Sequence, residues 1–245
     1  MNIDKILKKI NFKIKPNDNY RKAYLFRIKK GMCKIINLDK RFTFNNCILE
    51  KEVENTKLKN ALLKIDSMST YAVGHLVNQI CQQLSEKQTY LNIGCWKGFT
   101  LISGMIDTAC KVIGVDNFSQ FNGPKKEFYS NFKRYRNEEK HFFYDEDYKV
   151  FFEKFEKKNE KINFYYYDGE HSYKNQLENL EIADNFLDKG SIVLVDDINF
   201  SEVEDGTKDF LSKTKSSYKI LKEIKTANNH CHPSFWNGIM ILEKQ

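Results

Sequence analysis

The sequence predicts an α/β protein with a mostly parallel, seven-stranded sheet, helices on both faces and a basic N-terminal extension. From about residue 70 onward, short strand-like segments alternate with helix-like segments of about 10–15 residues, which is typical of a parallel sheet. The segment Ile192–Val195 (IVLV) is apolar throughout, as expected for a strand covered on both faces. The 245 residues include 19 Phe and 13 Tyr, which are enough aromatic side chains to fill a core.

Six segments show the spacing of amphipathic helices. In residues 70–84 the apolar side chains recur at helical intervals, and Ser69 stands where an N-cap is expected. In residues 174–187, Leu177, Leu180 and Ala183 share one face, and Gly190 follows as a breaker. Helices are therefore expected at 70–84, 100–109, 128–136, 148–158, 174–187 and 207–212.

Seven shorter segments are rich in β-branched and aromatic residues and are expected to be strands. Ile162–Tyr167 (INFYYY) is the strongest, because only Asn163 is neither β-branched nor aromatic. Glycine or aspartate ends several of these segments. The expected strands are 89–93, 111–115, 141–144, 162–167, 192–195, 218–224 and 238–242.

The charge is uneven along the chain. Residues 1–66 contain 17 Lys and Arg against 7 Asp and Glu, whereas residues 67–245 contain 23 against 26. We therefore predict a basic extension at 1–66 and a main domain at 67–245. The extension is either a solvated surface or a collar for an anionic substrate, nucleic acid or a membrane surface. Its segment 20–30 (YRKAYLFRIKK) mixes aromatic and basic residues and suits several of these partners.

Other features exclude several classes of protein. There is no run of about 18 apolar residues, so no membrane span is expected. The first residues have no apolar run of about 7–15 residues before a cleavage site, so we do not expect a secretory signal. We therefore expect a cytoplasmic location. Six cysteines are widely spaced without a C-x-x-C pair, which indicates free thiols rather than a zinc site.

A glycine-containing loop follows the first strand of the main domain. Gly94 permits a tight turn, and Gly98 permits close packing of the next helix. Trp96 occupies the second glycine position of a dinucleotide-binding loop, which argues against NAD. Asp116 ends the next strand, where a carboxylate can accept both hydroxyls of a ribose. Together the two features predict an adenosine-containing ligand without a diphosphate; separately, each also fits an ordinary turn or cap.

Acidic residues follow two further strands. Asp168 comes after INFYYY, and Asp196 and Asp197 come after IVLV. If these strands are neighbours, three carboxylates meet at one edge, where a proton or a hard divalent ion such as Mg²⁺ would offset their repulsion. Separate roles as caps and turn residues are the alternative. His171 lies in the same polar loop and is a candidate general base or substrate contact.

Four segments together resemble the class I S-adenosylmethionine-dependent methyltransferases. They are YLNIGCWKGFT, VIGVDNFS, FYYYDGEHSYKNQLENL and DKGSIVLVDDI. More narrowly, they are similar to small-molecule and sugar O-methyltransferases with a DG-x-H-x-Y motif. The resemblance covers residues 68–200 well and the last strands loosely, and it leaves residues 1–66 uncovered. It implies a Rossmann-like methyltransferase fold.

The resemblance also implies roles for particular residues. Gly94 and its neighbours would hold the methionine part of the cofactor, and Asp116 its ribose. Asp147 falls at a weakly matching adenine-contacting turn, and the family usually has an acid at the position of Asn92. The implied cofactor-binding residues are Asn92, Gly94, Cys95, Trp96, Gly98, Asp116, Asn117, Asp147 and Asp168. The implied ligands for Mg²⁺ are Asp168, Asp196 and Asp197.

The expected reaction is methyl transfer to a hydroxyl group. The ion would lower the pKa of the acceptor oxygens, and His171 or Glu170, beside Asp168, would take the proton. A sugar or an anionic small molecule is the expected acceptor, by analogy with the family. Residues 1–66 would form a lid or contacts with the acceptor or within a homo-oligomer, and the loop 230–236 (HCHPSFW) would line the acceptor pocket or serve only as structure.

Two other functions remain open. An RNA-directed methyltransferase would use the basic extension, although no N/D-P-P-Y-type loop follows any strand. A non-catalytic cofactor-binding scaffold is the second, and Asn92 is the feature that favours it. A nicotinamide oxidoreductase is disfavoured by Trp96.

Overall fold

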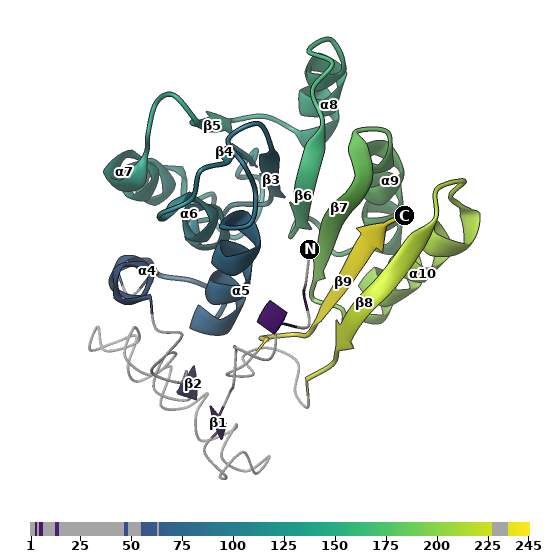
Figure 1. Cartoon of the computed structure of the whole chain (residues 1–245), viewed down its shortest axis with the longest axis horizontal. Helices are drawn as coiled ribbons and strands as arrows, with labels where there is room; N and C mark the ends of the chain where they lie inside the picture. The colour runs from purple at the N-terminus through teal and green to yellow at the C-terminus, as the bar shows by residue number, and fades with distance from the viewer. Residues whose placement is uncertain are drawn as a thin grey trace.

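A computed structural model of the chain describes residues 3, 5–6, 13–14, 47–48, 55–62, 64–226 and 235–245. Its centre is a seven-stranded sheet with the order β5-β4-β3-β6-β7-β9-β8 (Figure 1). β9 is antiparallel to both of its neighbours, and the other strands are parallel to one another. The strands are β3 (Thr89–Ile93), β4 (Lys111–Val115), β5 (His141–Tyr144), β6 (Ile162–Tyr167), β7 (Leu187–Asp196), β8 (Tyr218–Ile224) and β9 (Ile239–Lys244).

Helices cover both faces of this sheet, as the sequence predicts. Alternate strand residues point to opposite faces: Tyr90 and Tyr166 belong to one core cluster, and Leu91 and Tyr165 to the other. The first cluster includes α4 (Thr56–Leu62), α5 (Tyr71–Cys81), α6 (Phe99–Met105) and α7 (Lys125–Tyr135). The second includes α8 (Tyr148–Glu156), α9 (Tyr173–Asp184) and α10 (Ser201–Lys213).

The order of predicted strands and helices is confirmed, but several ends differ. Thr70, not Ser69, caps α5, because the Thr70 hydroxyl accepts a hydrogen bond from the Val73 N–H. Leu187 was expected at the end of a helix but begins β7, which continues through the exposed Gly190 in a left-handed conformation (φ +83°). The helix predicted at 207–212 starts at Ser201.

Parts of the N-terminal region pack with the main domain. Ile3, Ile6, Leu58 and Leu62 are buried in the same cluster as α5 and α6. β1 (Lys13–Ile14) pairs with β2 (Cys47–Ile48) in a separate antiparallel ladder. The basic segment 20–30 and residues 230–234 of the predicted acceptor loop lie outside the described residues.

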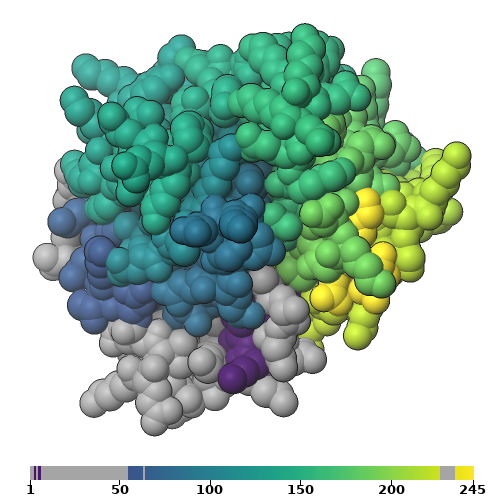
Figure 2. Space-filling model, turned by 45° about the horizontal axis from the view of Figure 1, so that its top comes forward, coloured from purple at the N-terminus to yellow at the C-terminus, as the bar shows by residue number. Residues whose placement is uncertain are grey.

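Two expectations on composition can be compared with the described residues. Cys81, Cys95 and Cys110 are buried free thiols, as predicted. Within the described ranges, no helix combines the length and the apolar character that a membrane crossing requires. Figure 2 shows the yellow-green residues of the β8 and α10 region at one side of the molecule, in agreement with the edge position of β8.

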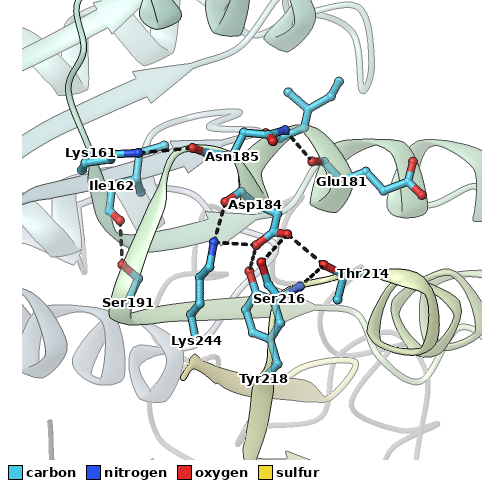
Figure 3. Close-up of polar contacts among 11 residues, drawn as sticks. Lys161, Ile162, Glu181, Asp184, Asn185, Ser191, Thr214, Ser216, Tyr218 and Lys244 are labelled. Carbon is cyan, nitrogen blue, oxygen red and sulfur yellow. Dashed lines mark hydrogen bonds and ion pairs between the residues drawn. The ribbon is translucent and has the colours of Figure 1, made fainter.

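A half-buried carboxylate, Asp184, connects the end of α9 to the segment that leads into β8 and to β9 (Figure 3). Asp184, at the end of α9, accepts hydrogen bonds from the hydroxyls of Thr214, Ser216 and Tyr218 at 2.8, 2.8 and 2.6 Å. Its Oδ1 also lies 2.8 Å from Lys244 Nζ. Burial raises the pKa of Asp184, but these donors outweigh burial and hold it below its ordinary value of 3.8.

We expect Asp184→Ala to lower the free energy of unfolding by about 2 kcal/mol, since four donors lose a charged acceptor. Because the folded-state pKa is depressed, the contribution of Asp184 is present above pH 3.8 and is lost as the pH falls through the folded value. Urea unfolding at pH 7 and at pH 3 measures both effects. An equal difference between wild type and variant at the two pH values would contradict this assignment.

Candidate active site

A cavity of about 610 Å³ lies where β3, β4, β6 and β7 end. In an open parallel sheet this edge is the usual place for a ligand. Most of the predicted site residues line it, although they are far apart in the chain. The predicted residues in its wall are Gly94, Cys95, Trp96, Asp116, Asn117, Asp147, Asp168, Glu170, His171, Asp196 and Asp197.

The turn after β3 requires glycine at position 94. Gly94 has a φ of +80°, and a Cβ at this position would overlap the carbonyl oxygen of Asp168. The Asp168 N–H in turn donates to the Ile93 carbonyl at 2.9 Å. The backbones that follow β3 and β6 therefore touch, which brings the glycine loop beside the acidic loop.

Asp116 organises the glycine loop. Its Oδ2 accepts from the backbone N–H groups of Cys95 and Trp96 at 2.8 and 2.7 Å, and its Oδ1 accepts from Phe118 N–H at 2.7 Å. A carboxylate has about four acceptor positions, so about one remains, on Oδ1. Asp116 is partly exposed in the cavity wall, and this position can accept one hydroxyl of a ligand.

Two predicted cofactor-binding residues, Asn92 and Gly98, are not in the cavity wall. Asn92 is fully buried; its side chain donates to the carbonyl of Gly94 at 3.2 Å and accepts from the Thr100 hydroxyl at 2.8 Å. Gly98 has a φ of +94° and lies at the start of α6. Both residues support the glycine loop from outside the cavity wall.

Asn117 and Asp147 lie in the wall beyond Asp116. Asp147 caps α8 by accepting from Lys149 N–H at 2.9 Å. Its other oxygen accepts from the Asn117 side chain at 3.4 Å. The wall is thus continuous from β4 to α8.

Asp168, His171 and Asp197 form a compact group. His171 Nε2 lies 2.9 Å from Asp197 Oδ2 and 3.7 Å from Asp168 Oδ1. One ligand atom from each residue lies within 4.8 Å of the others. Burial lowers the pKa of His171, but the two carboxylates outweigh burial and raise it to about 10. At neutral pH, His171 is therefore an imidazolium paired with two acids.

Asp196 differs from the two other predicted ligand carboxylates. One of its oxygens accepts from the Tyr166 hydroxyl, and the other accepts from the Asp197 N–H at 2.9 Å. Burial, then the charges of Asp197 and Asp168, raise the pKa of Asp196. Among the described residues, the group with metal-ligand spacing contains His171 in place of Asp196.

Asn237 is a site residue that the sequence analysis missed. Its side chain donates to Asp197 Oδ1 at 2.7 Å, on the carboxylate oxygen opposite His171. It is 3% exposed and lines the cavity. No motif marks it, because it lies 40 residues from Asp197, two residues before the start of β9. The antiparallel pairing of β9 with β7 brings the two together.

The described lining of the cavity is strongly acidic and contains no lysine or arginine. Glu146 forms an ion pair with Lys154, and His171 pairs with Asp168 and Asp197. These two cationic side chains offset part of the negative charge of the lining. Glu170 is exposed and accepts from the Asn175 side chain. The lining carboxylates are Asp116, Glu146, Asp147, Asp168, Glu170, Asp196 and Asp197.

Residues 91–198, which include the glycine loop and all three acidic strand ends, match the family model described as "Methyltransferase domain". This part of the chain is therefore similar to a methyltransferase domain. The sheet order agrees with this similarity, and the fold is a Rossmann-like methyltransferase fold. No curated protein matches the sequence.

Solved methyltransferase structures share the fold at low sequence identity. An O-methyltransferase from Bacillus cereus in complex with SAH is 13% identical, with a TM-score of 0.58 over 78% of this chain and 92% of that chain. The O-methyltransferase TomG from Streptomyces achromogenes, involved in tomaymycin synthesis and in complex with SAM, is 9% identical (TM-score 0.54; 81% and 91% covered). An SAH-bound methyltransferase from Podospora anserina is 10% identical (TM-score 0.51; 70% and 77% covered).

Proposed function

We propose that this protein is an S-adenosylmethionine-dependent O-methyltransferase whose acceptor is a hydroxyl of a small, neutral, polyhydroxylated molecule such as a sugar or glycan precursor. We assign residues 67–245 to the catalytic domain. One observation carries the proposal: in a chain whose residues 91–198 match a methyltransferase domain, a single cavity of about 610 Å³ joins the Gly94 turn, Asp116 and the Asp168–His171–Asp197 group. Its volume is in the range of sites for small molecules and cofactors, about 300–1,000 Å³.

The residues present fit the cofactor. Gly94 lets the backbones after β3 and β6 touch, which places the glycine loop beside the acidic loop, and the free acceptor position of Asp116 suits a ribose hydroxyl. The acidic lining suits a ligand that carries a sulfonium and an ammonium group. Several structures with this fold hold SAM or SAH. Asn92 and Gly98 would act indirectly, by holding the loop.

The same lining argues for a neutral acceptor. An anionic acceptor would meet seven carboxylates and, among the described residues, no lysine or arginine to offset them. Hydroxyl groups, in contrast, can donate to carboxylates. This disfavours the anionic acceptor considered from the sequence and also an RNA phosphate backbone. The choice of a sugar rests on the family resemblance.

In the proposed reaction, the acceptor oxygen forms a bond to the methyl carbon as the bond from carbon to sulfur breaks. The acceptor hydroxyl loses its proton to Asp168, whose pKa burial raises. A higher pKa makes a carboxylate a better base. His171 holds a proton already and therefore orients the two acids instead of acting as the base. Alignment of the reacting atoms supplies much of the remaining rate acceleration.

We include Mg²⁺ in the proposal. Asp168, Asp197 and His171 offer three ligand atoms within 4.8 Å, so these residues can hold a divalent ion, with Asp196 behind Asp197. The ion would supply positive charge that lowers the pKa of an acceptor hydroxyl. Asp168 would then bind the ion through one oxygen and keep the other oxygen for the proton of the acceptor. His171 would have to give up its proton to become a ligand.

We expect 10 mM Mg²⁺ or Mn²⁺ to raise the melting temperature of the wild type, since an ion that binds only the folded state stabilises it. Asp197→Asn should lose most of this shift. Scanning fluorimetry after removal of metal with EDTA, at matched ionic strength, measures it. Equal melting curves with and without the ions would remove the metal from the proposal.

The function itself is tested in two steps. Isothermal titration calorimetry with S-adenosylmethionine and S-adenosylhomocysteine should show binding at one site. Transfer of a labelled methyl group is then measured to neutral sugars, to their phosphates and uronic acids, and to RNA. Methylation of a neutral sugar supports the proposal. Binding without transfer to any of these acceptors favours the cofactor-binding scaffold, and absence of binding rejects the cofactor.

A further inference from the structure

The Asp197 carboxylate is held through both of its oxygens. Its Oδ2 lies 2.9 Å from His171 Nε2, and its Oδ1 accepts from the Asn237 side chain at 2.7 Å. The backbone at Asp197 is left-handed (φ +58°), a conformation that residues with a side chain rarely adopt. Asp196 accepts from its N–H and Phe200 donates to its carbonyl, each at 2.9 Å. Neighbouring residues thus fix the backbone, whereas two residues from other segments fix the carboxylate.

A tight turn before β9 presents Asn237 to Asp197. The Gly238 N–H donates to the Phe235 carbonyl at 2.7 Å and closes the turn. The Asn199 N–H donates to the Asn237 carbonyl at 2.9 Å, so the turn lies against the segment that follows β7. Gly238 has a φ of +83°, and a Cβ there would lie 2.6 Å from the Asn199 side-chain oxygen. The two segments are therefore in close contact, and this contact requires glycine at position 238.

The Asn199 side chain joins this turn to the chain that leaves β8. Its nitrogen donates to the carbonyl and to the hydroxyl of Thr226, at 3.1 and 2.8 Å, and its oxygen accepts from the Thr226 N–H at 3.2 Å. The Thr226 hydroxyl donates in turn to the Trp236 carbonyl at 2.9 Å. Asn199 and Thr226, which we call the asparagine–threonine clamp, therefore fix both Asn237 and the residue before it.

The clamp connects the ends of three strands that are neighbours in the sheet, β7, β9 and β8. Trp236 and Asn237 line the cavity. Asn199 and Thr226 are half-buried and are not among the described lining residues. The clamp therefore acts on the site through the turn, and not by contact of its own with a ligand.

The contacts continue from Asn237 to the proposed base. Asn237 occupies Oδ1 of Asp197, so that Oδ2 is the oxygen that pairs with His171. His171 Nε2 in turn lies 3.7 Å from Asp168 Oδ1. The last torsion of an aspartate side chain has a broad energy minimum, so the Asp197 carboxylate would rotate more freely without the donor on Oδ1. The imidazolium beside Asp168 would then lose its fixed partner.

We propose that Asn237 is a positioning residue for methyl transfer and that the asparagine–threonine clamp holds it in place. Asn237 fixes Asp197, which in turn fixes His171. His171 then sets the direction of the Asp168 carboxylate toward the acceptor hydroxyl. This inference rests on the proposed function, in which Asp168 takes the proton. Asp116 takes no part in these contacts, so the affinity for the cofactor should stay unchanged.

Single-turnover methyl transfer at saturating cofactor measures the expected loss. Asn237→Ala should lower the rate about tenfold, as for loss of a hydrogen bond to a charged group, with an unchanged Kd for S-adenosylmethionine. Thr226→Val, which removes the hydroxyl of the clamp, should lower the rate about threefold. Thr226→Ser, which keeps a hydroxyl, should restore most of that loss.

Asn78→Ala is the control for a purely structural effect. Asn78 is also a buried asparagine, and its side chain donates to the carbonyls of Ser103 and Ile106 at 2.9 and 2.7 Å. It is not among the described residues that line the cavity. This variant should therefore lose stability and keep the rate of methyl transfer.

A second measurement does not depend on the acceptor. In protein labelled with nitrogen-15 histidine, the ring nitrogen shifts of His171 at pH 7 report its contact with Asp197, and His171→Gln identifies these signals. Asn237→Ala and Thr226→Val should move the shifts, and Asn78→Ala should not. If the rate falls in Asn237→Ala but the shifts stay, the positioning role is rejected, because Asn237 then acts on the acceptor directly.

The outcomes separate this inference from the proposed function. If wild type binds no S-adenosylmethionine or methylates none of the acceptors, the proposed function fails and the positioning role fails with it. If wild type transfers the methyl group and Asn237→Ala keeps its rate, only the positioning role fails. Because Thr226→Val keeps the shape of the side chain, it carries the test if Asn237→Ala proves unstable, and melting temperatures identify that case.

Discussion

Gly94→Ala should lower the free energy of unfolding by about 4 kcal/mol and abolish binding of S-adenosylmethionine. The added methyl group would collide with the Asp168 carbonyl, and alanine would have to adopt the left-handed conformation of Gly94. To relieve the collision, the loops after β3 and β6 would have to separate. Chemical denaturation and calorimetry measure the two losses.

Gly190→Ala is the matched control for this substitution. Gly190 has nearly the same φ, +83° against +80°, but a Cβ there would meet no atom within 4 Å. It should cost about 1 kcal/mol, from backbone strain alone, and leave cofactor binding intact. Equal losses for the two variants would mean that the contact between the loops does not matter.

Asp168→Asn should reduce methyl transfer roughly 10³-fold, because the amide cannot take the proton of the acceptor hydroxyl. The side chain keeps its size, so we expect the melting temperature to stay close to that of wild type. Single-turnover rates at saturating cofactor isolate the chemical step. Asp188→Asn, at an exposed position of β7, is the control for a simple change of charge.

Glu170→Gln distinguishes the two carboxylates that follow β6. Glu170 is exposed and paired with Asn175, whereas Asp168 is beside His171. We expect Glu170→Gln to reduce the rate less than tenfold. A larger loss for Glu170→Gln than for Asp168→Asn would transfer the role of base to Glu170.

The sheet could be predicted from the sequence because its central strands are buried on both faces, and such strands are apolar throughout, as in the segment IVLV. The first turns of α10 were harder to predict from the sequence. Its residues 201–206 are polar apart from Val203 and Gly206, so apolar spacing gives little signal. Gly206 lies there because α9 packs closely: a Cβ would be 2.9 Å from the Tyr173 carbonyl oxygen.

The candidate site was predictable where it depends on strand ends and was not where it depends on side-chain direction. Gly94, Asp116 and Asp168 follow parallel strands, so the topology alone brings them to one edge. That Asp196 turns to Tyr166, and that Asn237 reaches Asp197, depends on packing between distant segments. The sequence predicts Ser69 as the N-cap of α5, but the helix begins one residue later and Thr70 caps it. Apolar spacing does not fix the start of a helix closely enough to decide between these two neighbouring hydroxyls.

The place of β9 in the sheet has a consequence for folding. β9 follows β8 in the chain but lies between β7 and β8, so β8 has no neighbour until β9 has docked. Both strands must therefore join the sheet late and together, through contacts of long sequence separation, which slows folding. Until then the hydrogen-bonding edge of β7 is open to strands of other molecules, and aggregation during refolding should depend on protein concentration.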